Sequence, residues 1–215
     1  MKKMYFFIAL LSLVLSGELS AQQVRIDSGP LVDRIKETVF TLNGYISDMV
    51  GECQNQDRTA CNQNRNRCKQ AALTLFVGGG ESYEVDGIRK EPVKMETTFI
   101  STNGSKSIKS QFMKVYFQKL IGLVTGVPPK YTKVTITSSE LGEIQVGNLH
   151  QINDNLYECI APFYQCFYGE RGEVMVYKDY TEKSVKCYVK VVPTPTGKEF
   201  ETLLGDTKCG ESHRL

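Results

Sequence analysis

The sequence is poor in the side chains that bind zinc or act as acid–base catalysts at neutral pH. It contains only two histidines, His150 and His213, and none of its seven cysteines forms a Cys-x-x-Cys pair. We therefore expect no metal site and no cofactor. A nucleophilic cysteine would need a nearby histidine to lower the pKa of its thiol. Because His150 is predicted near a turn at the surface and His213 in the tail, the sequence predicts no catalytic cysteine.

Strong net charge and runs of basic residues are also missing. The formal net charge is +2, and no cluster of lysine and arginine extends beyond a local patch around Arg65 and Arg67. This balance argues against nucleic acid or an anionic membrane as the main partner. Downstream of the N-terminus there is no apolar run long enough to cross a membrane, and no repeat or linker is evident. We therefore expect one domain and no membrane span in the processed chain.

The N-terminus does carry one apolar run, and its flanks are those of a secretory signal peptide. Lys2 and Lys3 precede an apolar stretch from Met4 to Leu15, and Leu19-Ser20-Ala21 offers a small residue for cleavage. The alternative is a membrane anchor, but the run is shorter than the roughly 20 residues that span a bilayer. We predict that residues 1–21 are removed and that the protein is exported to the periplasm, the cell surface or the medium.

In an exported chain, cysteines are expected to form disulfides, and seven leave one over. Cys159 and Cys187 fall on the same apolar face of two long predicted strands. If these two residues lie opposite one another, they can form a cross-strand disulfide. The alternative is that they are two buried free thiols, which pack as small apolar side chains.

Helical spacing is found in three stretches. The first runs from Gly29-Pro30 to about Val50 with apolar residues every three or four positions, and the second from Asp57, as N-cap, to about Phe76. A third helix is predicted from about Ser107 to Val124. Between the second and third, Asp86-Gly87 predicts a short hairpin.

The stretch from Asn155 to Val192 has the period of two that is typical of strands, with a Gly-rich turn or excursion predicted at Gly169, Arg171 and Gly172. Tyr131–Ser138, Ile144–Ile152 and Glu199–Leu204 are predicted as further strands. The buried row of the long pair is predicted to comprise Tyr157, Cys159, Ala161, Phe163, Gln165, Phe167, Val185, Cys187, Val189 and Val191.

These elements predict an α+β fold in which three N-terminal helices and a short hairpin pack against a strongly curved, four-stranded antiparallel sheet, giving a cone. Residues 22–28 would be a polar lead, 29–205 the single domain and 206–215 a polar tail. In element order and strand length, Gly29 to Leu204 resembles the nuclear-transport-factor-two-like superfamily of cystatin-like α+β cones. The resemblance implies a pocket between sheet and helices. The extra length of Tyr164–Lys183 is a departure from that superfamily and predicts an extended hairpin arm.

The superfamily includes isomerases, dehydratases, transport adaptors and binding domains, so the resemblance does not decide the function. An isomerase of this fold needs an inward carboxylate, and no Asp, Glu or His falls on the predicted inward rows, since Asp179 is placed near a turn. We therefore predict no catalytic residue. An apolar pocket with polar groups is the alternative to a simply filled core. Its lining would be Tyr116, Tyr157, Phe163, Gln165 and Phe167.

The outer face of the sheet is the other candidate site. Tyr164 and Tyr188 are predicted there beside Lys186, a composition suited to a protein–protein interface, although an ordinary solvated surface fits as well. We predict a non-enzymatic binding or assembly domain whose partner is a second copy or another envelope or extracellular protein. A small lyase or isomerase acting on an apolar ligand is the alternative. A pocket that is open to solvent and contains Asp, Glu or His would favour the enzyme.

Overall fold

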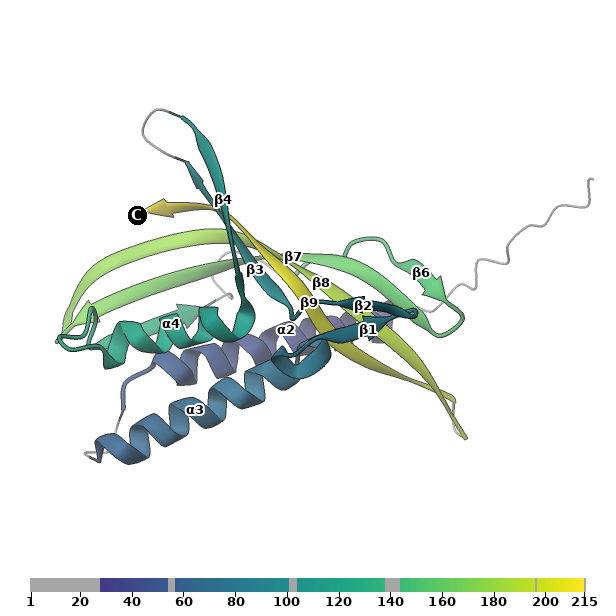
Figure 1. The fold of residues 1–215 in the computed structure, drawn as a ribbon, viewed down its shortest axis with the longest axis horizontal. Helices are drawn as coiled ribbons and strands as arrows, with labels where there is room; N and C mark the ends of the chain where they lie inside the picture. Colours follow the sequence, from purple (N-terminus) through teal and green to yellow (C-terminus); the bar gives the residue numbers. More distant parts are fainter. Residues whose placement is uncertain (1–27, 54–56, 101–103, 138–143, 196, 215) are drawn as a thin grey trace, which may run out of the picture.

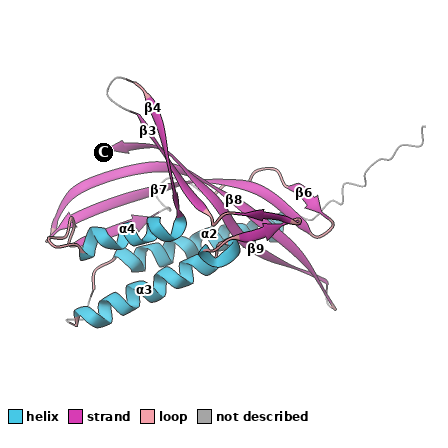
Figure 2. Cartoon of the chain, in the orientation of Figure 1, coloured by secondary structure: helices cyan, strands magenta, loops and turns pink. Residues whose placement is uncertain are grey.

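The computed structural model describes residues 28–53, 57–100, 104–137, 144–195 and 197–214, and the predicted signal peptide lies outside them. The described chain is α+β, with its helices on one side of a long, strongly bent sheet (Figures 1 and 2). The described residues include no helix long and apolar enough to span a membrane.

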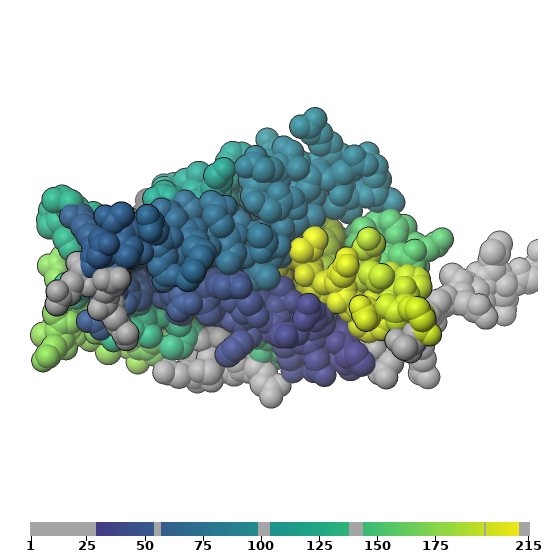
Figure 3. Space-filling model, turned by 90° about the horizontal axis from the view of Figure 1, so that it is seen from below, coloured from purple at the N-terminus to yellow at the C-terminus, as the bar shows by residue number. Residues whose placement is uncertain are grey.

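Helix α2 (Ser28–Val50) packs against the sheet through an apolar stripe that runs along most of its length. Leu31, Ile35 and Val39 are fully buried, and the stripe continues to Met49. Helix α3 (Arg58–Thr74) begins where predicted, with the Asp57 side chain accepting a hydrogen bond from the Thr59 backbone N–H. It packs on α2 and on α4 (Met113–Thr125), and Figure 3 shows α2 and α3 covering the face opposite the sheet.

A small sheet of β1 (Tyr83–Val85) and β2 (Ile88–Lys90) forms the predicted hairpin, after a short 3-10 turn, η1 (Val77–Gly80). Asp86 and Gly87 both have positive φ, which is the backbone conformation that a two-residue hairpin turn requires. The hairpin therefore follows directly from its Asp-Gly pair.

The main sheet has seven strands in the order β4-β3-β9-β8-β7-β5, with β6 also paired to β7. Its pairs are antiparallel except that β3 runs parallel to β9. The strands are β3 (Lys94–Ile100), β4 (Lys106–Phe112), β5 (Lys133–Thr137), β6 (His150–Asn153), β7 (Leu156–Arg171), β8 (Val174–Thr194) and β9 (Gly197–Arg214).

The long strand pair follows the predicted alternation. β7 and β8 pair from Leu156↔Lys190 to Arg171↔Val174 around a turn at Gly172. The predicted buried rows face the helices, and all of their members are buried except Phe167, which is half-buried. Lys190 on the opposite row is exposed. The helix-facing side of this ribbon was therefore assigned correctly from the period of two.

The prediction of a four-stranded antiparallel sheet is wrong. The sheet is mixed and has seven strands, because β3 and β4 join it through the parallel contact between β3 and β9. That contact pairs Met95 with Thr207, residues far apart in the sequence, so no local pattern signals it. Part of the predicted third helix is also strand. Residues 106–112 pair along all of β3, and α4 begins only at Met113.

The predicted polar tail is instead the end of β9, which continues to Arg214. Thr207 and Cys209 are 3% and 8% exposed, and each pairs with β3. The polar composition of this segment misled the prediction, because its burial comes from a strand on either side. Backbone pairing of this kind does not require apolar side chains.

Candidate functional site

The main cleft lies between α4 and the bent ribbon of β7 and β8, and it has a volume of about 520 Å³. This size is typical of pockets for small molecules. α4, the loop after it, and strands β3, β7, β8 and β9 all contribute. The lining comprises Thr97, Thr98, Tyr116, Leu123, Lys130, Tyr131, Gln165, Phe167, Tyr177, Asp179, Thr181, Lys183, Cys209 and Gly210.

Three aromatic rings form one wall of the cleft. Tyr131, Phe167 and Tyr177 pack with ring centroids 5.8–6.4 Å apart. The exposed ammonium of Lys130 lies 5.2 Å from the ring centroid of Tyr131 and 6.0 Å from that of Tyr177. The wall is thus apolar, with a cation at its edge.

The side chain of Lys183 lies inside the cleft and is only 6% exposed. The Lys183 ammonium donates to the Gln165 side-chain oxygen and, over 3.3 Å, to the Tyr116 hydroxyl. Gln165 in turn donates to the Asn43 side-chain oxygen over 2.8 Å, which aims its own oxygen at the lysine. Asn43 is on α2, so the helix layer positions a charged group within the sheet.

Two opposing influences act on the pKa of Lys183. Burial is the largest and lowers it, because a low dielectric disfavours the ammonium. The hydrogen bond to the Tyr116 oxygen and the proximity of the Cys209 sulfur and the Asp179 carboxylate act in the opposite direction, and the pKa lies above the usual lysine value. Lys183 is therefore protonated at neutral pH and is not a nucleophilic amine.

One carboxylate also lines the cleft. Asp179 lies on the helix-facing row of β8, and its Oδ2 accepts a hydrogen bond from the Tyr177 hydroxyl over 2.7 Å. The predicted position of Asp179 near a turn is wrong, because β8 begins at Val174 and Asp179 lies within it. The predicted inward row of the second strand began at Val185 and therefore did not include Asp179.

The predicted pocket residues divide into two groups. Tyr116, Gln165 and Phe167 line the cleft. Tyr157 and Phe163 are 7% and 4% exposed within the core cluster, and they do not line it. For these two, the alternative that they simply fill the core agrees with their position.

The predicted interface residues differ in exposure. Tyr164 is 40% exposed, whereas Tyr188 is only 5% exposed, so its placement on an open surface is wrong. Lys186 is half-buried, pairs with Glu158 at 2.9 Å and lies 5.8 Å from the centroid of the Tyr188 ring. Self-association through this face stays a prediction.

Cys159 and Cys187 are paired directly opposite one another in the β7–β8 register, the arrangement that a cross-strand disulfide would need. Both are buried free thiols in this structure, which matches the second interpretation of this pair. The hydrogen bond with Cys159, together with burial, raises the pKa of Cys187, so that it remains a thiol at neutral pH. One disulfide is present among the described residues, between Cys53 and Cys61.

Lys183 was not among the predicted site residues, although the sequence contains a signal for it. Continuing the alternate row from Val185 toward the turn gives Lys183, Thr181, Asp179 and Tyr177, all of which line the cleft. The prediction of an extended arm for this stretch depends on its excess length over the superfamily that the chain resembles. It is instead part of the bent ribbon above α4 (Figure 1).

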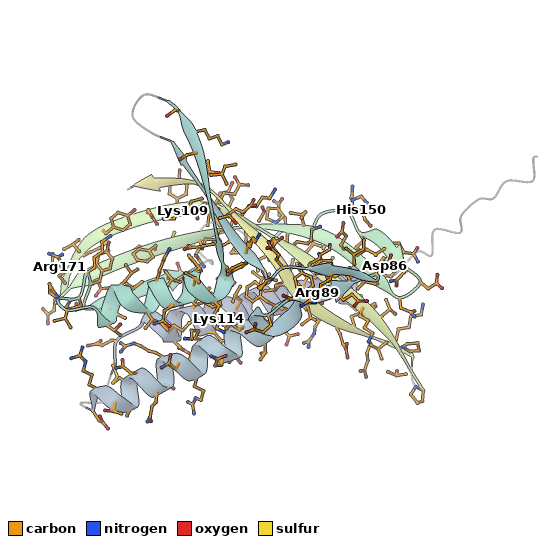
Figure 4. The ribbon with its side chains drawn as sticks, in the orientation of Figure 1. Asp86, Arg89, Lys109, Lys114, His150 and Arg171 are labelled. Atoms are coloured by element: carbon orange, nitrogen blue, oxygen red, sulfur yellow. A yellow bond between two sulfur atoms is a disulfide. The ribbon has the colours of Figure 1, made fainter. Side chains whose placement is uncertain are left out.

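The histidine that was predicted at the surface, His150, lies away from the cleft. Figure 4 places His150 far along the sheet from Arg171, whose Nε donates to the Lys130 carbonyl at the edge of the cleft. His150 is exposed on β6 and does not contribute to the cleft. Within the described ranges, no three His, Cys, Asp or Glu side chains are grouped as metal ligands.

No protein-family model matches the chain, and no curated protein is similar to it in sequence. Membership of the nuclear-transport-factor-two-like superfamily stays a prediction. The proposed function therefore rests on the residues of the cleft.

Proposed function

We propose that this protein is an exported, non-enzymatic binding protein that takes an apolar small molecule into the cleft beneath β7 and β8. The observation that carries the proposal is the cleft itself, at about 520 Å³, with an aromatic wall and a few polar groups. Pockets for small ligands generally combine a largely apolar lining with a small number of polar groups that set orientation.

The exported location is part of the proposal. It is supported by the basic and apolar pattern of residues 1–21. The disulfide between Cys53 and Cys61 is in keeping with an oxidising compartment. The five free cysteines, from Cys68 to Cys209, are all buried.

The test is titration of the full chain with the neutral fluorescent probe N-phenyl-1-naphthylamine. We expect saturable binding of one probe per chain, with energy transfer from tyrosine, since the sequence contains no tryptophan. Thr181→Phe fills part of the cleft and should weaken binding roughly tenfold or more, the cost of overpacking a fitted site. Thr74→Phe, an exposed change at the end of α3, is the matched control. Absent or unsaturable binding would overturn the proposal.

A small lyase or isomerase is the second candidate, because Asp179 provides a carboxylate within the cleft. Proton abstraction requires such a base within hydrogen-bond reach of the substrate. We place it second because Asp179 is already hydrogen-bonded by Tyr177 and no histidine lines the cleft. Incubation with enolisable apolar ketones in heavy water distinguishes the two. Deuterium exchange that disappears in Asp179→Asn would favour the enzyme.

A further inference from the structure

Within the part of the chain that the structure describes, the Lys183 ammonium donates to two acceptors, which leaves one N–H donor available. An ammonium carries three N–H donors. Two of them are used within the described residues, by Gln165 and Tyr116, and both acceptors are neutral groups. No carboxylate among the described residues lies within 4.0 Å of this nitrogen. A buried cation whose hydrogen-bond partners are all neutral is costly unless something else compensates its charge.

The surrounding contacts hold this ammonium in one place. The chain of hydrogen bonds from Asn43 through Gln165 links α2 to β7 and then to Lys183 on β8. The Tyr116 ring, on α4, lies with its centroid 5.6 Å from the same nitrogen. A charge fixed by three elements loses little conformational entropy when a ligand binds it, which favours affinity.

The net charge of the described cleft lining is positive. It comprises two cations, Lys130 and Lys183, and one carboxylate, Asp179. Asp179 favours the charged form of Lys183 from a distance, but its Oδ2 is occupied by the Tyr177 hydroxyl. The cleft therefore keeps an excess of positive charge beside its apolar wall.

We propose that the ligand of this cleft is an amphipathic anion, with an apolar body against Tyr131, Phe167 and Tyr177 and an acidic oxygen on the ammonium of Lys183. The inference rests on the proposed binding function and adds the chemical class of the ligand. A carboxylate or sulfonate accepts a hydrogen bond from the remaining N–H and supplies a counter-charge to this buried ammonium, and charge-assisted hydrogen bonds are strong in buried positions. Lys130, at the edge, attracts the same charge on entry.

A pair of fluorescent probes with the same ring skeleton tests the inference on the full chain. 1-Anilinonaphthalene-8-sulfonate carries a sulfonate that the neutral N-phenyl-1-naphthylamine lacks. We expect the wild-type protein to bind the anionic probe about 10- to 100-fold more tightly, as expected for a hydrogen bond to a charged group. Lys183→Met should remove that preference while the neutral probe still binds. Lys190→Met, an exposed lysine of the same strand, should leave both affinities unchanged.

The outcomes separate this inference from the proposed function. Equal affinity of the wild type for the two probes, or a preference for the neutral one, overturns the anion inference and leaves a neutral binding cleft. Failure of both probes to bind overturns both. The wild-type comparison needs no variant, so it decides the matter even if Lys183→Met does not fold. Competition by dodecanoate and by 1-naphthoate then distinguishes a lipid-derived carboxylate from an aromatic acid, because either one displaces the probe only if its apolar part fits.

Discussion

At the scale of single residues, the shape of the cleft depends on close packing that leaves no room for a larger side chain at Gly169. Gly169 on β7 packs against the ring of Tyr131, and a Cβ atom at this position would lie 2.5 Å from that ring. Real side-chain contacts are not so short, so either the ring or the strand would have to move. The same ring forms part of the aromatic wall, which links a small packing change to the shape of the site.

Gly169→Ala should therefore lower the free energy of unfolding by roughly 1–3 kcal/mol, the usual cost of overpacking. It should also weaken binding of the neutral probe, because Tyr131 is pushed toward the cleft. Gly44→Ala is the matched control. It lies within α2 with no atom within 4 Å of the added methyl group, and should gain roughly 0.5–1 kcal/mol. Urea unfolding measures both, and a neutral Gly169→Ala would mean that Tyr131 does not pack there.

At the scale of elements, the β1–β2 hairpin explains why the outer face of the sheet is not open at Tyr188. Tyr83, from β1, lies in the same cluster as Tyr188 and Asp206, and Lys90 of β2 lies 5.9 Å from the centroid of the Tyr188 ring. Burial is the main cause that raises the pKa of Tyr83, followed by the nearby Tyr188 and Asp206 charges. The short hairpin thus covers a ring that the strand alternation alone would leave in water.

This environment predicts a loss of stability at alkaline pH. Below the ordinary tyrosine pKa of about 10, Tyr83 is protonated in both the folded and the unfolded state and has no effect on the balance. As the pH rises above it, the unfolded chain releases the proton while the folded state retains it, so unfolding becomes more favourable up to the raised pKa.

Tyr83→Phe should consequently lose less stability than the wild type between about pH 9 and pH 11. The measurement is the midpoint of urea unfolding as a function of pH. Tyr164→Phe, at a tyrosine that is 40% exposed, should follow the wild-type curve. Superimposable curves for Tyr83→Phe and wild type would contradict a raised pKa at the half-buried Tyr83.

At the scale of the whole molecule, the sheet is joined across its centre by the end of the chain. β9 pairs with β8 along almost its full length and with β3 through Met95↔Thr207 and its neighbours. Without residues 207–209, β3 and β4 would lose their contact with the rest of the sheet, and Thr97, Thr98 and Cys209 would leave the cleft lining. The C-terminal strand therefore completes both the sheet and the candidate site.

Proline at Thr207 tests this arrangement, because proline cannot donate to either neighbouring strand and is tolerated only at sheet edges. Thr207→Pro should cost roughly 3 kcal/mol or more, or prevent folding. Gln151→Pro, on the exposed edge strand β6, should cost much less. Thermal unfolding compares the two. A Thr207→Pro protein as stable as Gln151→Pro would show that the C-terminus is a loose tail after all.

The sequence alone was sufficient wherever a short-range period or a turn signal decides the structure. The apolar stripe of α2, the Asp57 cap of α3, the Asp86-Gly87 turn and the buried row from Tyr157 to Phe163 were all predicted, because each depends on neighbours a few residues away. Tyr116, Gln165 and Phe167 were placed at the site for the same reason.

The remaining features depend on contacts between segments that are distant in the sequence. Local sequence patterns do not predict such contacts. The pairing of Met95 with Thr207 made the sheet mixed, and pairing along β3 turned residues 106–112 from a predicted helix into a strand. The burial of Lys183 is of the same kind. A lysine in sequence indicates a solvated surface, and it is held inside this protein because Asn43, Gln165 and Tyr116 arrive from three other elements to surround it.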